Sequence, residues 1–83
     1  MEEVVISDLY ALSALRLHGL QPTRTTQEGH RTAWVFRDTP EVRELLEAYY
    51  GHRLSVDPLE FAERVRSAKG EAVNLRRPLS VLT

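Results

Sequence analysis

The segment from Asp8 to His18 most constrains this chain, because it is a predicted helix with apolar residues on nearly all sides. We expect Ser7 to cap this helix, Asp8 to lie in its first turn, and Gly19 to end it. A helix that is apolar nearly all round must be buried on several sides. A chain of 83 residues offers little other protein to bury it. Either the remaining elements wrap this helix, or a second chain covers part of it.

A β-hairpin is predicted over residues 20–37, where threonines and then a β-branched and aromatic run favour two strands. Glu28-Gly29 is the expected turn. With a two-residue loop, Thr25 faces Thr32 across the hairpin. Trp34 is expected to lie in the core. The second strand is therefore the better covered of the two, and the threonine-rich strand lies nearer an edge.

Two further helices are predicted to begin at Thr39-Pro40 and Asp57-Pro58, where a capping residue is followed by a proline at the first helical position. Glycines are expected to end them, at Gly51 and Gly70. Between the two helices, residues 54–56 suit a very short strand. The first of these helices has a regular apolar stripe, formed by Val42, Leu45, Leu46 and Tyr49.

Residues 71–83 are expected to form a basic and apolar C-terminal arm that follows a compact domain over residues 1–70. Apolar residues alternate along this arm, with Pro78 as an interruption. A tail of this kind favours docking, either on its own body or on a neighbour. The arm and the apolar first helix both indicate a homo-oligomer, with the candidate interface residues Leu12, Leu15, Val73, Leu75, Leu79 and Val81.

The expected elements are therefore a helix, a hairpin, two more helices and an extended arm. Val4–Ile6 suits a brief strand or an extended lead-in at the start. This order predicts an α+β fold, in which helices pack on a small antiparallel sheet.

Three stretches, Ile6–Gly19, Trp34–Pro40 and Asp57–Phe61, resemble the pattern of the DUF5659 family of small prokaryotic and phage domains. The resemblance covers residues 6–69 and leaves the arm outside. It brings no catalytic residue. It implies a small stand-alone protein of a mobile element or its host.

The composition limits the chemistry that this chain can perform. It has no cysteine, which excludes disulfides and thiolate zinc sites. The histidines at 18, 30 and 52 lack the spacing of metal ligands, and the glycines are isolated, so no phosphate-binding loop is present. No serine lies in a nucleophile motif. We therefore expect no catalytic, cofactor-binding or metal-binding residue, no small-molecule substrate and no enzyme activity.

The charge is near zero overall but unevenly spread. With a formal net charge of −1, the whole protein is not expected to attract nucleic acid or a membrane. No run approaches the roughly 18 apolar residues of a membrane span, and no signal peptide opens the chain, so we expect a cytoplasmic protein. Residues 64–83, however, carry five basic side chains against one acidic one. This basic end either complements an acidic body, its own or a twin subunit's, or binds a polyanion.

Two functions follow from these observations. The first is a non-enzymatic interaction or accessory protein, homo-oligomeric, that acts by binding another protein. The alternative is a nucleic-acid-binding accessory protein that uses the basic C-terminal region and hairpin arginines. Its candidate contacts are Arg24, Arg31, Arg76 and Arg77.

Overall fold

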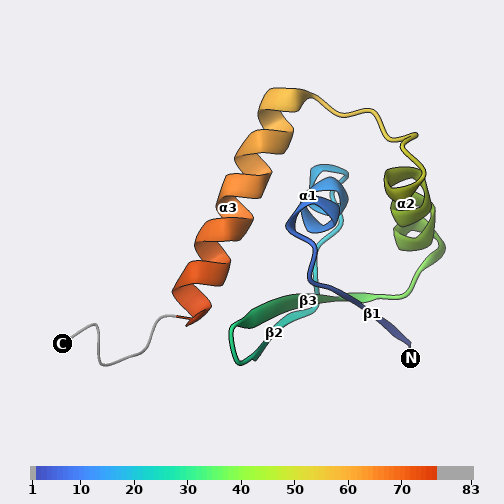
Figure 1. Cartoon of the computed structure of the whole chain (residues 1–83). Coiled ribbons are helices and arrows are strands. Elements are labelled where there is room, and N and C mark those ends of the chain that lie inside the picture. The colour runs from blue at the N-terminus through green and yellow to red at the C-terminus, as the bar shows by residue number, and fades with distance from the viewer. Residues whose placement is uncertain (1, 77–83) are drawn as a thin grey trace.

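The computed structural model describes residues 2–76 as an α+β fold, which confirms the predicted fold class. Three helices accompany a small antiparallel sheet in this part of the chain (Figure 1). The elements are β1 (Glu3–Ile6), α1 (Leu9–Leu17), β2 (Arg24–Glu28), β3 (Arg31–Arg37), α2 (Pro40–Tyr50) and α3 (Pro58–Arg76).

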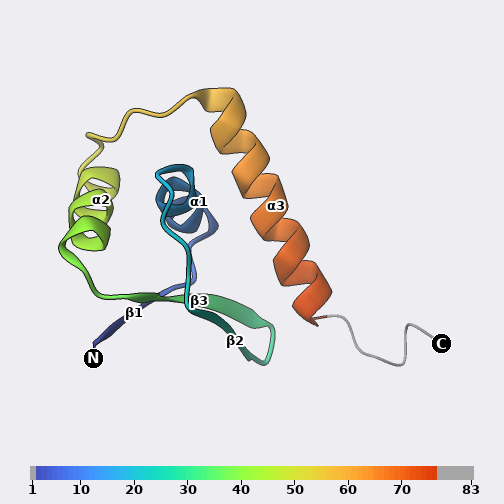
Figure 2. The same ribbon diagram turned by 180° about the vertical axis from the view of Figure 1, so that it is seen from behind.

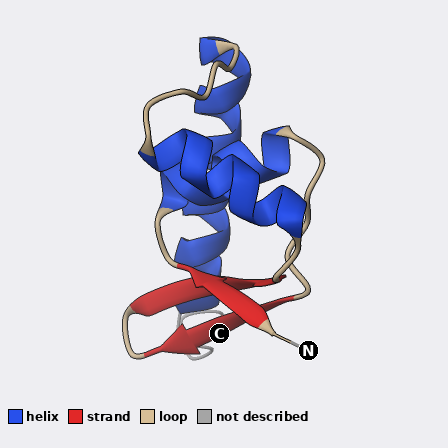
Figure 3. Cartoon of the chain, turned by 90° about the vertical axis from the view of Figure 1, so that its right-hand side faces the viewer, coloured by secondary structure: helices blue, strands red, loops and turns tan. Residues whose placement is uncertain are grey.

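The sheet has the strand order β1-β3-β2, and both pairings are antiparallel. The helices lie on one side of this sheet (Figure 3). Within that layer α1 lies between α2 and α3, above the sheet, as both views of the ribbon show (Figures 1 and 2). The central strand β3 is the better covered one, as predicted, because its residues from Thr32 to Phe36 are all buried.

The apolar helix α1 is wrapped by its own chain. Leu12 and Leu15 are fully buried and share one core cluster with Trp34, Phe36 and Val42. The prediction that Leu12 and Leu15 belong to an oligomer interface is therefore wrong. The sheet, α2 and α3 together supply the cover that a second chain was expected to provide.

The cap of α1 differs from the predicted one. Asp8, not Ser7, is the N-cap, and its carboxylate accepts hydrogen bonds from the backbone N–H groups of Tyr10 at 2.8 Å and Ala11 at 3.4 Å. The carboxylate also suits the positive end of the helix dipole. At the other end, Gly19 follows the helix with φ of +84°, as expected for a glycine that ends a helix.

The hairpin has a two-residue loop, but the loop is Gly29-His30 rather than Glu28-Gly29. Gly29 takes a positive φ of 59°, and Glu28 faces Arg31 in the closing pair. Moving the loop by one residue shifts the strand register by two. Thr25 therefore faces Trp34, and the predicted pairing of Thr25 with Thr32 is wrong.

Local signals place the starts of α2 and α3 correctly. The Thr39 hydroxyl accepts a hydrogen bond from the Val42 backbone N–H at 3.2 Å, and Gly51 ends α2 as predicted. The Asp57 carboxylate caps α3 by accepting from the N–H groups of Leu59 and Glu60. Residues 54–56 form a loop and not the short strand that was predicted.

Helix α3 continues through Gly70 to Arg76, so the predicted end at Gly70 is wrong. Ala68 and Ala72 are both buried on the packed side of this helix, and the contacts on either side of Gly70 hold it in the helix. Residues 71–76 are thus the last turns of α3 and not the start of an extended arm. Residues 77–83, with the rest of the predicted arm, lie outside the described residues.

Candidate functional site

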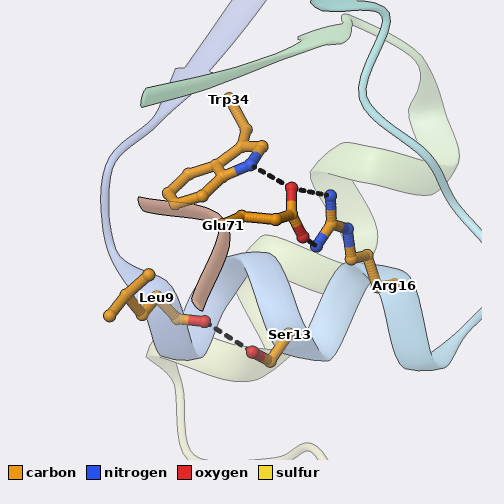
Figure 4. Close-up of polar contacts among 5 residues, drawn as sticks. All are labelled: Leu9, Ser13, Arg16, Trp34 and Glu71. Atoms are coloured by element: carbon orange, nitrogen blue, oxygen red, sulfur yellow. Dashed lines mark hydrogen bonds and ion pairs between the residues drawn. The ribbon is translucent and has the colours of Figure 1, made fainter. Parts of the chain in front are cut away.

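A polar cluster joins α1, β3 and α3 (Figure 4). The two terminal nitrogens of the Arg16 guanidinium both donate to the Glu71 carboxylate, one of them over 3.0 Å. The Trp34 indole N–H donates to the same carboxylate over 3.3 Å. The Arg16 side chain is only 14% exposed, whereas the Glu71 side chain is 38% exposed. The cluster therefore lies at the boundary of the core.

The electrostatics of this cluster keep Glu71 ionised. Hydrogen bonding from Arg16 lowers the pKa of Glu71, and partial burial opposes this effect. Trp34 lowers the pKa further through its own hydrogen bond. A carboxylate with a lowered pKa, held by a guanidinium that does not release its proton, is poorly suited to general acid catalysis. The arrangement suits a structural role, in which Arg16, Glu71 and Trp34 hold α3 against α1 and the sheet. We call these three residues the clamp.

The clamp has one unsatisfied group. The Nε atom of Arg16 is buried and has no hydrogen-bond partner among the described residues. A second contact holds the other half of α3, since the rings of Tyr10 and Phe61 stack with centroids 6.1 Å apart. Helix α3 is thus attached to α1 at two points along its length.

Sequence reasoning missed the clamp. Arg16 lies in the predicted first helix and Glu71 at the start of the predicted arm, and no sequence pattern pairs the two residues. One signal was available: Arg16 is the single charged residue between Leu9 and Leu17. A charge in an otherwise apolar helix calls for a partner, although the sequence alone does not say which one.

The sheet has a second face that no described helix covers, and we call it the uncovered face (Figure 3). Side chains alternate along a strand, so the strand register decides which residues lie on it. Trp34 and Phe36 point into the helical layer and the core. Their neighbours along β3, and the residues paired with those neighbours, lie on the uncovered face: Glu3, Val5, Arg24, Thr26, Glu28, Arg31, Ala33, Val35 and Arg37.

An ion pair crosses the uncovered face from one edge strand to the other. Arg24 on β2 contacts Glu3 on β1 with 2.7 Å between nitrogen and oxygen, so the two side chains reach across β3. Val35 lies beneath this crossing and is 1% exposed. Val5, by contrast, is 63% exposed. Both partners of the ion pair are about half exposed, so the pair adds little stability.

Two shallow hollows flank the end of β1. The one on the uncovered face has a volume of about 180 Å³, with Val5, Thr26 and Ala33 in its lining and Glu28 and Arg31 beside them. The other has a volume of about 320 Å³ and lies on the helical side, where its lining includes Ser7, Leu9, His30, Thr32, Trp34 and Ala72. Within residues 2–76 no three potential metal ligands are grouped together.

The structure brings some of the predicted nucleic-acid contacts together and separates others. Arg24 and Arg31 share the uncovered face with Arg37, which was not among the predicted contacts. Arg76 is the last residue of α3, in the helical layer, and Arg77 lies outside the described residues. Trp34 is buried, as expected, and is not available to stack on bases.

Of the remaining residues predicted for an oligomer interface, two lie on α3 and two lie outside the described part of the chain. Val73 and Leu75 are about half exposed on the last turns of α3. Leu79 and Val81 lie outside the described residues. In the part of the chain that is described, no helix has the length and apolar character needed to cross a membrane.

Comparison with known proteins adds no relative. No family model, no curated protein and no solved structure matches this chain. The resemblance to the DUF5659 family therefore stays a prediction.

Proposed function

We propose that this chain is a small, non-enzymatic, cytoplasmic interaction protein that binds another protein through the uncovered face of its sheet. The observation that carries this proposal is the one-sided packing of the sheet, in which the described helices all lie on one face. Most antiparallel sheets of this kind turn a polar face to water. Here that face instead exposes the apolar side chain of Val5, which is 63% exposed, next to Ala33 and Val35, which are buried under the side chains around them.

The arrangement of side chains on this face supports protein binding. Apolar side chains and Thr26 form its centre, and charged residues of both signs surround them. An apolar core with a polar rim is the usual anatomy of a protein–protein interface. The suitable partner is a protein that places an apolar side chain against Val5 and carboxylates against the three arginines.

A matched pair of substitutions tests this proposal. Val5→Lys places a charge at the exposed apolar residue of the uncovered face, and Leu59→Lys places the same charge on α3 at a residue that is 77% exposed. Both sites are exposed, so each variant is expected to fold. Tagged wild type and both variants are compared as baits by quantitative mass spectrometry of co-purified proteins.

We expect a partner that the wild type and the Leu59→Lys variant recover equally and that the Val5→Lys variant loses. A partner set that is identical for all three baits would overturn the assignment to this face.

Nucleic-acid binding is the second candidate, because Arg24, Arg31 and Arg37 share the uncovered face. It ranks lower because Glu3 and Glu28 lie among these arginines and offset most of their charge. It predicts binding to DNA or RNA that weakens steeply with salt and is lost in an Arg31→Ala/Arg37→Ala variant. The absence of binding in a fluorescence anisotropy titration at low salt would exclude it.

A further inference from the structure

Strand β2 is an edge strand of the sheet. Among the described residues its strand partner is β3 alone, and four of its five residues are exposed. Natural proteins usually protect such edges with prolines, charged side chains, bulges or a covering helix. β2 has the sequence Arg-Thr-Thr-Gln-Glu, with no proline. Its two end residues carry opposite charges, so they do not repel a second antiparallel copy of the same strand.

The hydrogen bonding of β3 shows which backbone groups of β2 point outward. The Asp38 N–H donates to the Glu2 carbonyl on the β1 side, and the Val35 carbonyl accepts from Thr23 on the β2 side. Because hydrogen-bonding groups alternate along a strand, the odd-numbered residues of β3 bond to β2. In the observed register these residues face Arg24, Thr26 and Glu28. The peptide groups of Thr25 and Gln27 therefore point away from the sheet.

The geometry points to a symmetric dimer in which β2 pairs antiparallel with β2 of a second copy of this chain. Thr26 then faces Thr26 of the partner subunit on the two-fold axis. Arg24 faces Glu28 of the partner subunit, and Glu28 faces Arg24 of the partner subunit. The two-fold axis repeats the contact between Arg24 and Glu28, so the edge is complementary to a second copy of itself at both ends.

The register of this pairing follows from the backbone. Only outward-pointing peptide groups can bond across the new edge, so Thr25 and Gln27 must pair with Thr25 or Gln27 of the partner subunit. Three registers satisfy this condition. Only the register that pairs Thr25 with Gln27 of the partner subunit also places the positive Arg24 across from the negative Glu28 of the partner subunit. In it the Thr26 pair is of the closer, non-hydrogen-bonded kind, and threonine pairs stabilise sheets in such positions.

The existing ion pair of Arg24 is compatible with this arrangement. Arg24 and Glu3 are both about half exposed, so the guanidinium is accessible to a second carboxylate. In the dimer Arg24 lies between Glu3 and Glu28 of the partner subunit. Both contacts lie on the uncovered face, because Arg24, Glu3 and Glu28 all project there.

The dimer also enlarges the uncovered face, to which the proposed function assigns partner binding. This consequence of the dimer, unlike the pairing itself, rests on the proposed function. The sixteen residues of the three strands, each about 3.4 Å long and about 4.8 Å wide, give a face of about 260 Å². A stable interface takes about 800 Å² from each partner. A continuous sheet of six strands doubles the uncovered face to about 520 Å².

Charge-reversal variants test the pairing. The Arg24→Glu variant has two acidic residues at the ends of its edge, and the Glu28→Arg variant has two basic ones. Two copies of the same variant repel each other at the ends of β2. One copy of each variant attracts the other at both ends of β2. Glu63→Arg, an exposed reversal on α3, is the matched control. Sedimentation equilibrium measures association for each full-length chain and for the equimolar mixture, and near-UV circular dichroism of Trp34 checks the fold.

We expect the wild type and the Glu63→Arg variant to dimerise with the same Kd. Each edge variant should show a Kd at least about tenfold higher, and the mixture should form a heterodimer. A wild type that is monomeric at about 1 mM, or edge variants that dimerise like the wild type, would overturn the pairing. Partner loss on Val5→Lys is measured separately, so the dimer and the proposed function can fail independently.

Discussion

At the scale of single residues, the contact between Arg16 and Glu71 has the largest consequence. It joins residues 55 positions apart and, with Trp34, links three elements. Removing one partner leaves the other as a poorly compensated charge, and Arg16 is the more buried of the two. Removing one partner of the clamp is therefore expected to lower the free energy of unfolding by more than the intact ion pair contributes to it.

Glu71→Gln tests this reasoning. The amide keeps the shape but removes the negative charge that compensates Arg16. We expect a loss of about 1–2 kcal/mol in the free energy of unfolding, a value kept low because Glu71 is partly exposed. Urea denaturation measures it. Glu63→Gln, an exposed change on the same helix, should stay within about 0.5 kcal/mol of the wild type. Equal effects of the two changes would contradict the clamp.

The same pair gives the fold a defined pH dependence. Because the folded-state pKa of Glu71 is lowered, its contribution is fully present above the unfolded pKa of about 4.3. The contribution is lost as the pH falls through the lowered folded-state value. Unfolding measured from pH 7 down to about 2 should therefore show a shallower acid limb for Glu71→Gln than for the wild type. Parallel curves would show that Glu71 is not held ionised by Arg16.

Residue-level prediction from sequence succeeded where the determinant is local. Thr39 and Asp57 each cap the amide groups two or three positions ahead, so their neighbours in sequence suffice to identify them. Ser7 and Asp8 are both short polar residues, and only the position at which the chain enters the helix after β1 selects Asp8. The partner of Arg16 depends on the full path of the chain, which no local pattern contains.

At the scale of elements, tertiary contacts extended α3 beyond its local stop signal. An isolated glycine commonly ends a helix, and Gly51 and Gly19 do so here. Gly70 does not, because Ala68 and Ala72 are buried on either side of it. The hairpin register failed for a related reason, since Glu-Gly and Gly-His were both available as the loop and differ by one position.

Gly70→Ala tests the extension of α3. A methyl group at this position would meet no atom within 4 Å, and alanine favours a helix over glycine. We expect a gain of about 0.5–1 kcal/mol, which raises Tm by roughly 2–8 °C. The control is Gly19→Ala, which should lower Tm because φ there is +84°. A lower Tm for Gly70→Ala would mean that the helix does not pass through this residue.

At the scale of the whole molecule, the apolar character of α1 correctly predicted that it is buried on several sides. It did not decide between cover by the same chain and cover by a second one. The structure settles this for Leu12 and Leu15, which the sheet, α2 and α3 enclose. The sheet was harder to foresee, because the alternation of β3 is weak and both of its faces carry apolar residues. Which face the helices cover follows only from the path of the chain.

Association at the edge of the sheet leaves a signature in single backbone amides. The N–H groups of Thr25 and Gln27 point away from β3, and that of Thr26 points toward it. Amide hydrogen exchange of the full-length chain, followed by NMR at low and high protein concentration, is the most direct measurement. We expect protection at Thr25 and Gln27 to rise with concentration while Thr26 stays equally protected. Fast exchange of Thr25 and Gln27 at every concentration would contradict association through this edge.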